Sequence, residues 1–284
     1  RGPAPAGTAA ARLAAELSLP DGSLMRVALG IEYDGTSYNG WQRQKTGLGV
    51  QQRVEEALGV VANHPVEVIC AGRTDTGVHA TDQVVHFDTD SERSERGWLL
   101  GANTNLPDDI NVSWVALVAD DFHARFSATS RSYRYLILNR LQRSALHRHR
   151  AWWVYEPLDA ERMHAAAQRL LGEHDFSAFR AAGCQANTAV RNMTHISVSR
   201  DGDWITLDVT ANAFLQHMVR NITGTVATVG LGEERVEWIT EVLESRDRKA
   251  GGIAAPAHGL TLAGVEYPAA FGVPAAGCSH PIRI

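Results

Sequence analysis

The chain has 284 residues, which is enough for two domains or for one large one. Hydrophobic residues make up 44% of the sequence and charged residues 21%, a balance that excludes global disorder. No apolar run approaches the ~18 residues that a membrane-spanning helix needs. The three cysteines, Cys70, Cys184 and Cys278, lie far apart and form no CxxC pair. This spacing disfavours a disulfide framework or a structural zinc site, and such a protein is expected in the reducing cytoplasm.

Apolar periodicity in the first half predicts strands that alternate with helices. Residues 1–23 are rich in Ala, Gly and Pro and are expected to form a flexible extension. After them we expect strands at 25–33, 66–70, 83–87 and 112–118, and helices at 50–61 and 93–102.

The second half repeats this pattern, which is typical of an α+β fold. We expect strands at 133–139, 195–199, 204–210 and 260–267, and helices at 158–171, 214–229 and 236–243. The similar makeup suggests a duplicated domain with a cleft between its copies. The predicted units are the extension 1–23, an N-terminal half 24–125, a C-terminal half 126–270 and a tail 271–284.

The net charge is −5, but the charge is unevenly distributed. Residues 122–155, called the basic segment below, hold seven of the 27 basic residues and none of the 32 acidic residues. Its arginines are Arg125, Arg131, Arg134, Arg140, Arg143, Arg148 and Arg150, with aromatic residues interleaved. This pattern indicates a local polyanion-binding surface, with a solvated charged face as the alternative.

The loop at 72–77 reads GRTDTG, and its two glycines let the backbone turn sharply and present Arg73 and Asp75. One interpretation is an ordinary surface turn. Asp-Thr-Gly is also the aspartic-protease signature, but no second copy supplies the partner carboxylate. A third interpretation makes Asp75 a lone nucleophile or base, with Arg73 contacting a phosphate or a base.

The predicted helix at 214–229 is apolar on most faces and carries one formal charge, Arg220. A buried guanidinium needs an anion, and Asp75 is the candidate because a neighbouring guanidinium stabilises an ionised carboxylate. Alternatively, Arg220 lies on an exposed stripe with Gln216 and Thr223.

Tyr133 and Tyr135 face one side of their predicted strand and Arg134 faces the other. Tyrosines on a sheet face usually pack in the core, but beside the basic segment they could stack on a nucleobase.

Asp75, His79, Asp82 and His86 lie within twelve residues and superficially suit a metal hydrolase. Their spacing matches none of the helical zinc motifs, and the segment is predicted as a turn followed by a strand. We therefore expect no metal site here.

Seven motifs occur in the order seen in the tRNA pseudouridine synthase A family, which the chain resembles from about residue 25 to residue 267. They are GRTDTGVHA, DQVVHF, NTNLPDDI, DFHARFSATSRSYRY, HDFSAFR, FLQHMVRNITG and APAHGL. The resemblance implies an α+β fold of two RNA-recognition-like halves whose antiparallel sheets merge around a central basic cleft. Thr76, where Ala is common, Asp82 and the longer N-terminal extension are minor departures.

The resemblance also implies an isomerase that converts uridine to pseudouridine at positions 38, 39 and 40 of the tRNA anticodon stem-loop. Such enzymes are homodimers that need neither metal nor organic cofactor. Asp75 matches the catalytic aspartate, and Arg73 matches the arginine that binds and displaces the target base. Tyr133 matches the tyrosine that stacks on the uracil, with a part in removing its C5 proton, and Arg220 matches the partner of the catalytic aspartate. The RNA contacts expected from the basic segment are Arg125, Arg131, Arg134, Arg140 and Arg143.

Two other functions compete with this one. The first is a non-catalytic RNA-binding protein of the same fold, although a pure binder needs neither Asp75 nor Tyr133. The second is a metal-dependent RNA hydrolase, which a chelator would stop.

Overall fold

The computed structural model describes residues 24–275. Its longer strands are β1 (Met25–Tyr33), β3 (His79–Thr89), β4 (Ile110–Val118), β5 (Ser130–Asn139), β8 (Val190–Asp201), β9 (Trp204–Ala211) and β10 (Leu260–Glu266). Its short strands are β2 (Ile69–Cys70), β6 (Trp152–Val154) and β7 (Gly172–Asp175). Its α-helices are α2 (Val50–Ala62), α3 (Glu95–Asn105), α4 (Ala160–Gln168), α5 (Met218–Gly230) and α6 (Trp238–Ser245).

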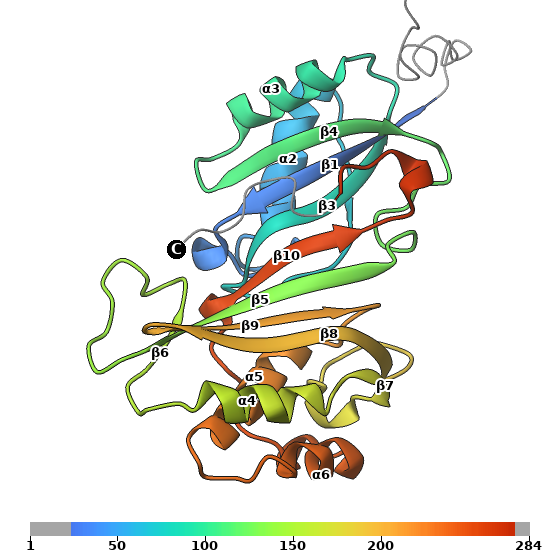
Figure 1. Ribbon diagram of the computed structural model, residues 1–284. Coiled ribbons are helices and arrows are strands. Elements are labelled where there is room, and N and C mark those ends of the chain that lie inside the picture. The colour runs from blue at the N-terminus through green and yellow to red at the C-terminus, as the bar shows by residue number, and fades with distance from the viewer. Residues whose placement is uncertain (1–23, 276–284) are drawn as a thin grey trace, which may run out of the picture.

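Within the described range, the strands form one ten-stranded sheet. The order along it is β4-β1-β3-β10-β5-β9-β8-β7, with β2 added on β3 and β6 on β5. The pairs β10–β3 and β5–β6 are parallel, and the other pairs are antiparallel. Figure 1 shows β10, the last strand of the described residues, between β3 and β5. This strand therefore joins the first half of the chain to the second.

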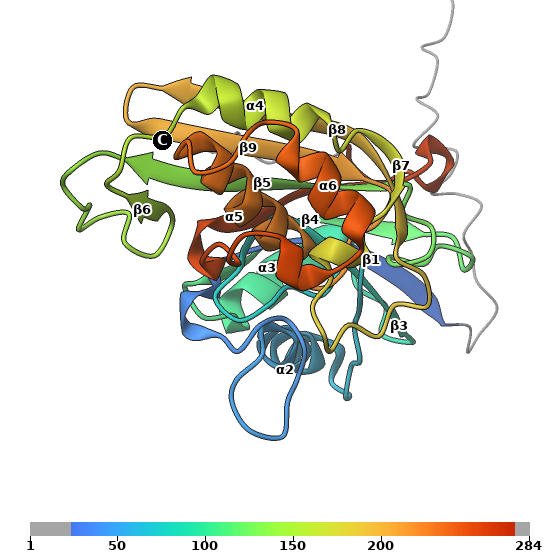
Figure 2. The same ribbon diagram turned by 90° about the horizontal axis from the view of Figure 1, so that it is seen from below.

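The helices pack in two groups at opposite ends of the sheet (Figure 1). In the first group α3 packs on α2 and on β4, and in the second α4 packs on β8 and on α5. Figure 2 shows α4, α5 and α6 lying together beside β8 and β9. The spacing of Val50, Val54 and Leu58 explains which face of α2 packs in the core. Residues four apart share one helix face, and all three are buried.

The predicted α+β class is confirmed, and every predicted strand and helix is present to within a few residues. The short strands β6 and β7 were not predicted. The description as two RNA-recognition-like halves around a basic cleft stays a prediction. The expected extension 1–23 and residues 276–284 of the expected tail lie outside the described residues. No helix between residues 24 and 275 is long and apolar enough to cross a membrane.

Candidate active site

The loop that carries Asp75 connects β2 to β3 and is fixed at both ends by hydrogen bonds. Ala71 N donates to the Val84 carbonyl (2.8 Å), and the buried Gln83 amide donates to the Gly72 carbonyl (2.6 Å). At the other end, Val78 N donates to the carbonyl of Asp75 itself (3.1 Å). We call residues 71–78 the aspartate loop, and its anchoring leaves the Asp75 carboxylate in a defined place.

A second loop, residues 34–49, packs against the aspartate loop and is hydrogen-bonded to it. Trp41 N donates to the Thr74 carbonyl (3.0 Å), and the Tyr33 and Thr74 hydroxyls share a 2.7 Å hydrogen bond. The close approach depends on Gly40, whose φ is +90°. A Cβ at this position would lie 2.7 Å from the Thr74 carbonyl oxygen, so only glycine fits without displacing one of the loops.

Arg220 reaches Asp75 from the first turn of α5. Its Nη1 lies 3.7 Å from Asp75 Oδ2, and 17% of the Arg220 side chain and 24% of the Asp75 side chain is exposed. The guanidinium is held from the other side by Ala255, because Arg220 Nε donates to the Ala255 carbonyl (2.8 Å) and Ala255 N donates to the Arg220 carbonyl (3.0 Å). Of the two interpretations of Arg220, the partly buried ion pair with Asp75 is the one present.

His217 is a second neighbour of the Asp75 carboxylate, and sequence reasoning assigned it no role. Its Nε2 lies 3.5 Å from Asp75 Oδ2. His217 is three residues before Arg220, and this spacing puts two side chains on one face of a helix. His217 itself precedes α5 in a left-handed conformation, so this helical spacing does not account for the contact, and no signal in the sequence predicts it.

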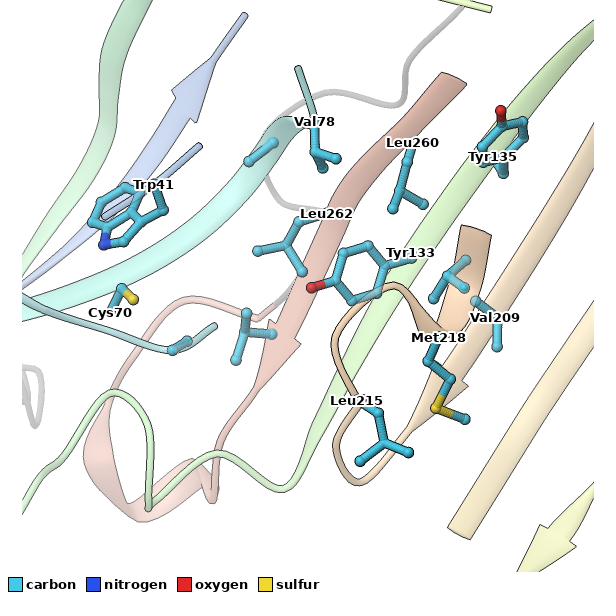
Figure 3. Close-up of a cluster of buried hydrophobic side chains, with 14 of the residues drawn as sticks. Trp41, Cys70, Val78, Tyr133, Tyr135, Val209, Leu215, Met218, Leu260 and Leu262 are labelled. Carbon is cyan, nitrogen blue, oxygen red and sulfur yellow. The ribbon is translucent and has the colours of Figure 1, made fainter. Parts of the chain in front are cut away.

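Tyr133 brings a third element, β5, to the site. Its buried ring meets Phe214 edge-on, with 5.0 Å between the ring centres. Burial raises the pKa of the Tyr133 hydroxyl well above its usual value of 10.0, and the negative charge of Asp75 raises it further. Figure 3 shows the ring beside Leu262 of β10, with the hydroxyl on the side of Cys70. The aspartate loop, β5 and α5 thus place Asp75, Tyr133 and Arg220 around one point.

Arg73 lies on the same loop, two residues before Asp75, and its side chain is exposed. Among the described residues it forms no ion pair. Its guanidinium is therefore available to an outside anion or base.

The basic segment is less free than its charge suggests. Arg131 is buried and donates to four backbone carbonyls, those of Ala71, Arg125, Ala128 and Asn212. Arg131 thus links the start of the aspartate loop to β5. Its guanidinium binds backbone carbonyls and does not face solvent.

Other arginines of the segment pair with aspartates from outside it. Arg134 binds Asp208 through two nitrogens, at 2.7 and 3.1 Å. Arg140 lies 3.4 Å from Asp203, and Arg150 lies 2.7 Å from Asp34. The exposed arginines without such a partner among the described residues are Arg125, Arg143 and Arg148.

The histidines near Asp75 are engaged by the backbone. His79 Nδ1 lies 3.0 Å from Gly35 N, and His79 Nε2 donates to the His149 carbonyl at 2.8 Å. His86 Nδ1 accepts from Ala124 N at 3.1 Å. In residues 24–275, no group of three or more His, Cys, Asp or Glu side chains is placed to hold a metal ion.

A family model for tRNA pseudouridine synthase matches residues 30–127 and 166–268 of this chain. The chain belongs to the tRNA pseudouridine synthase family. It is therefore an isomerase.

Curated relatives match over nearly their full length. Proteins named tRNA pseudouridine synthase A from Pseudoalteromonas atlantica and Aeromonas hydrophila are each 58% identical over 250 residues, and one from Vibrio campbellii is 57% identical. Each match covers 88% of this chain and 93–95% of the relative.

Proposed function

We propose that this synthase converts uridine to pseudouridine at positions 38, 39 and 40 of the tRNA anticodon stem-loop, with Asp75 as the catalytic residue and without a cofactor. The observation that carries the proposal is the meeting of Asp75, Arg220 and Tyr133 from three separate elements. The names of the relatives support tRNA as the substrate.

The reaction breaks the bond between uracil N1 and ribose C1′ and forms a bond between uracil C5 and C1′. The proton on C5 leaves and N1 gains one, so no oxidant, reductant or energy source is consumed. Asp75 acts either as a nucleophile at C1′ or as a base that takes a ribose proton to give a glycal. Both roles require an ionised carboxylate, which Arg220 stabilises.

The target nucleotide must leave the base stack to reach Asp75, which costs a few kcal/mol of unstacking. Exposed Arg73 occupies the space from which the base leaves and contacts the RNA there. Tyr133 stacks on the uracil and retains it after the N1–C1′ bond breaks. The raised pKa keeps the Tyr133 hydroxyl protonated in the free enzyme, so it accepts the C5 proton only if its own proton leaves at the same time.

The RNA contacts that we retain from the basic segment are Arg125, Arg140 and Arg143, which have exposed or half-exposed guanidinium groups. Arg131 is left out because backbone carbonyls occupy its donors, and Arg134 because Asp208 binds it through two nitrogens, whereas Arg140 meets Asp203 through one longer contact of 3.4 Å. We further propose that the enzyme is a cytoplasmic homodimer.

The test is to map pseudouridine in an unmodified tRNA transcript after incubation with the pure protein in EDTA. We expect pseudouridine at positions 38–40, and its appearance elsewhere would reject the assigned positions. Binding without pseudouridine would indicate a non-catalytic RNA-binding protein. Strand cleavage that EDTA stops would indicate a hydrolase.

The matched variants are Asp75→Asn and Asp108→Asn, of which the second removes an exposed carboxylate outside the site. Asp75→Asn keeps the side-chain shape but removes the nucleophile or base, so we expect turnover to fall at least ~10³-fold. The Kd for tRNA is expected to stay within about threefold, measured by filter binding. A parallel loss of binding would contradict a purely catalytic role.

A further inference from the structure

His217 has an unusual backbone for the residue that precedes a helix. Its φ is +61°, and the other non-glycine residues with positive φ in the described range are Asn63 and Arg246. Those two end α2 and α6, a position where the left-handed conformation is common. His217 instead precedes the first turn of α5, where an extended backbone is usual.

The left-handed conformation is unfavourable for a residue with a Cβ, so the surrounding structure must hold it. Ala181 N donates to the Gln216 carbonyl (3.0 Å), and Asn221 N donates to the His217 carbonyl (2.9 Å). This conformation directs the imidazole toward Asp75, and its Nε2 lies 3.5 Å from Asp75 Oδ2.

The two partners of Asp75 approach the same oxygen. Arg220 Nη1 and His217 Nε2 are both nearest to Oδ2, at 3.7 and 3.5 Å. No side chain of the described chain forms a hydrogen bond with the Asp75 carboxylate, so these two cationic or polar neighbours are its charged surroundings. Two neighbours this close to the carboxylate restrict the positions that it can take.

We propose that His217 is a positioning residue, which together with Arg220 holds the Asp75 carboxylate in the orientation that faces the ribose. This inference rests on the proposed role of Asp75. It explains why an unfavourable backbone is retained at this residue, since an extended residue there would direct its side chain elsewhere. A catalytic group that is displaced by about 1 Å loses on the order of 10²-fold in rate.

The deciding pair of variants is His217→Gln and His217→Glu. The two side chains have the same shape and impose the same backbone cost, but Gln can donate to Oδ2 where Glu repels Asp75 and competes for Arg220. In single-turnover measurements at saturating tRNA, we expect Gln to keep the rate within about threefold of the wild type and Glu to lower it about 10- to 100-fold. Equal rates for the two variants would overturn the proposal.

His217→Gly tests the backbone argument separately, with Arg246→Gly as its matched control. Both replacements relieve a left-handed conformation, so both proteins are expected to melt at or above the wild-type temperature. The rate should fall about tenfold for His217→Gly and stay unchanged for Arg246→Gly. A wild-type rate in His217→Gly, or an equal fall in Arg246→Gly, would contradict the positioning role.

These outcomes are distinct from a failure of the proposed function. If the proposed function is wrong, the wild type forms no pseudouridine in tRNA or Asp75→Asn remains active. If only the positioning role is wrong, the wild type is active, Asp75→Asn is inactive, and the His217→Gln and His217→Glu variants do not differ.

Discussion

The Tyr133 hydroxyl lies beside the aspartate loop, and a Cβ on Gly72 would be 3.9 Å from it. No residue in the described part of the chain forms a hydrogen bond with this hydroxyl. Removing it therefore leaves no donor or acceptor unpaired, and the ring keeps its contact with Phe214.

Tyr133→Phe is thus expected to leave the melting temperature unchanged or slightly raised. If the hydroxyl takes part in moving the C5 proton, kcat should fall about 10²-fold while KM for tRNA changes less than threefold. Steady-state kinetics with a tRNA transcript measures both values. Unchanged kcat would restrict Tyr133 to stacking.

The pairing of Arg220 with Asp75 could be predicted, because one guanidinium in an apolar helix needs an anion and the aspartate loop offered one. His217 could not be predicted, although it stands in the same motif. Its contact depends on a left-handed backbone, and a histidine in the sequence gives no sign of that conformation.

At the scale of elements, a substitution in the loop 34–49 can measure how strongly activity depends on the position of the aspartate loop. Gly40→Ala would place a Cβ 2.7 Å from the Thr74 carbonyl oxygen at a φ of +90°. Gly202→Ala is the control, because Gly202 has a φ of +56° with no atom within 4 Å of its Cβ position.

We expect Gly202→Ala to cost about 1 kcal/mol of unfolding free energy, from the backbone alone. Gly40→Ala should cost more and should also lower kcat, because the steric contact displaces the loop that carries Asp75. Urea unfolding and turnover measure the two effects. Equal unfolding free energies and equal kcat for the two variants would show that the contact is unimportant.

The basic segment shows where counting charges in a sequence misleads. Seven arginines without an acidic residue among them indicated a polyanion-binding surface, but Asp34, Asp203 and Asp208 pair with three of them from distant parts of the chain. A fourth arginine of the segment, Arg131, is buried. Sequence distance does not report these partners, because the sheet brings them together.

The double variant Arg140→Ala/Arg143→Ala should weaken tRNA binding and reduce the salt dependence of log Kd by about 1–2, one for each lost phosphate contact. Arg169→Ala/Arg235→Ala is the control, since it removes the same charge from ion pairs of α4 and α6 outside the segment. Binding titrations across a range of KCl concentrations give the slopes. The same slope in both double variants would mean that the basic segment does not face the RNA.

The short strands β6 and β7 escaped prediction for a related reason. β6 has three residues and β7 reads GEHD, so neither offers the alternation of apolar and polar residues that predicts a strand. Their pairing with β5 and β8 decides their conformation.

For the molecule as a whole, His86 makes stability depend on pH. Burial lowers its pKa from the usual 6.5 to about 4, with the charges of Arg26 and His123 acting in the same direction. The folded protein therefore favours neutral His86. The stability that this preference contributes is fully present above pH 6.5 and is lost as pH falls toward 4.

We expect the free energy of unfolding, measured in urea, to decrease steadily between pH 6.5 and pH 4.5. His86→Asn supplies an oxygen acceptor for Ala124 N without a titrating ring, so its decrease should be smaller. Carboxylates with a lowered pKa, such as Asp88, stabilise the fold above their usual 3.8 and lose that contribution mainly below it, outside this pH range. Equal pH dependence in both proteins would contradict the assignment to His86.

The order of the sheet was beyond prediction. Periodicity identifies β10 as a strand, but its place depends on an antiparallel register with β5 and on a short parallel register with β3, in which Thr261 pairs with His79 and Leu262 with Ala80. Because the paired residues lie far apart in the sequence, no local sequence pattern predicts these contacts.

The position of β10 also sets when the enzyme becomes able to work during its synthesis. About 120 residues separate the end of β5 from the start of β10, and a ribosome needs roughly 6–24 s to add them. Until then a nascent chain lacks the strand that pairs both with β3, which follows the aspartate loop, and with β5, which carries Tyr133. We therefore expect a translation product that stops short of β10 to lack an assembled catalytic centre.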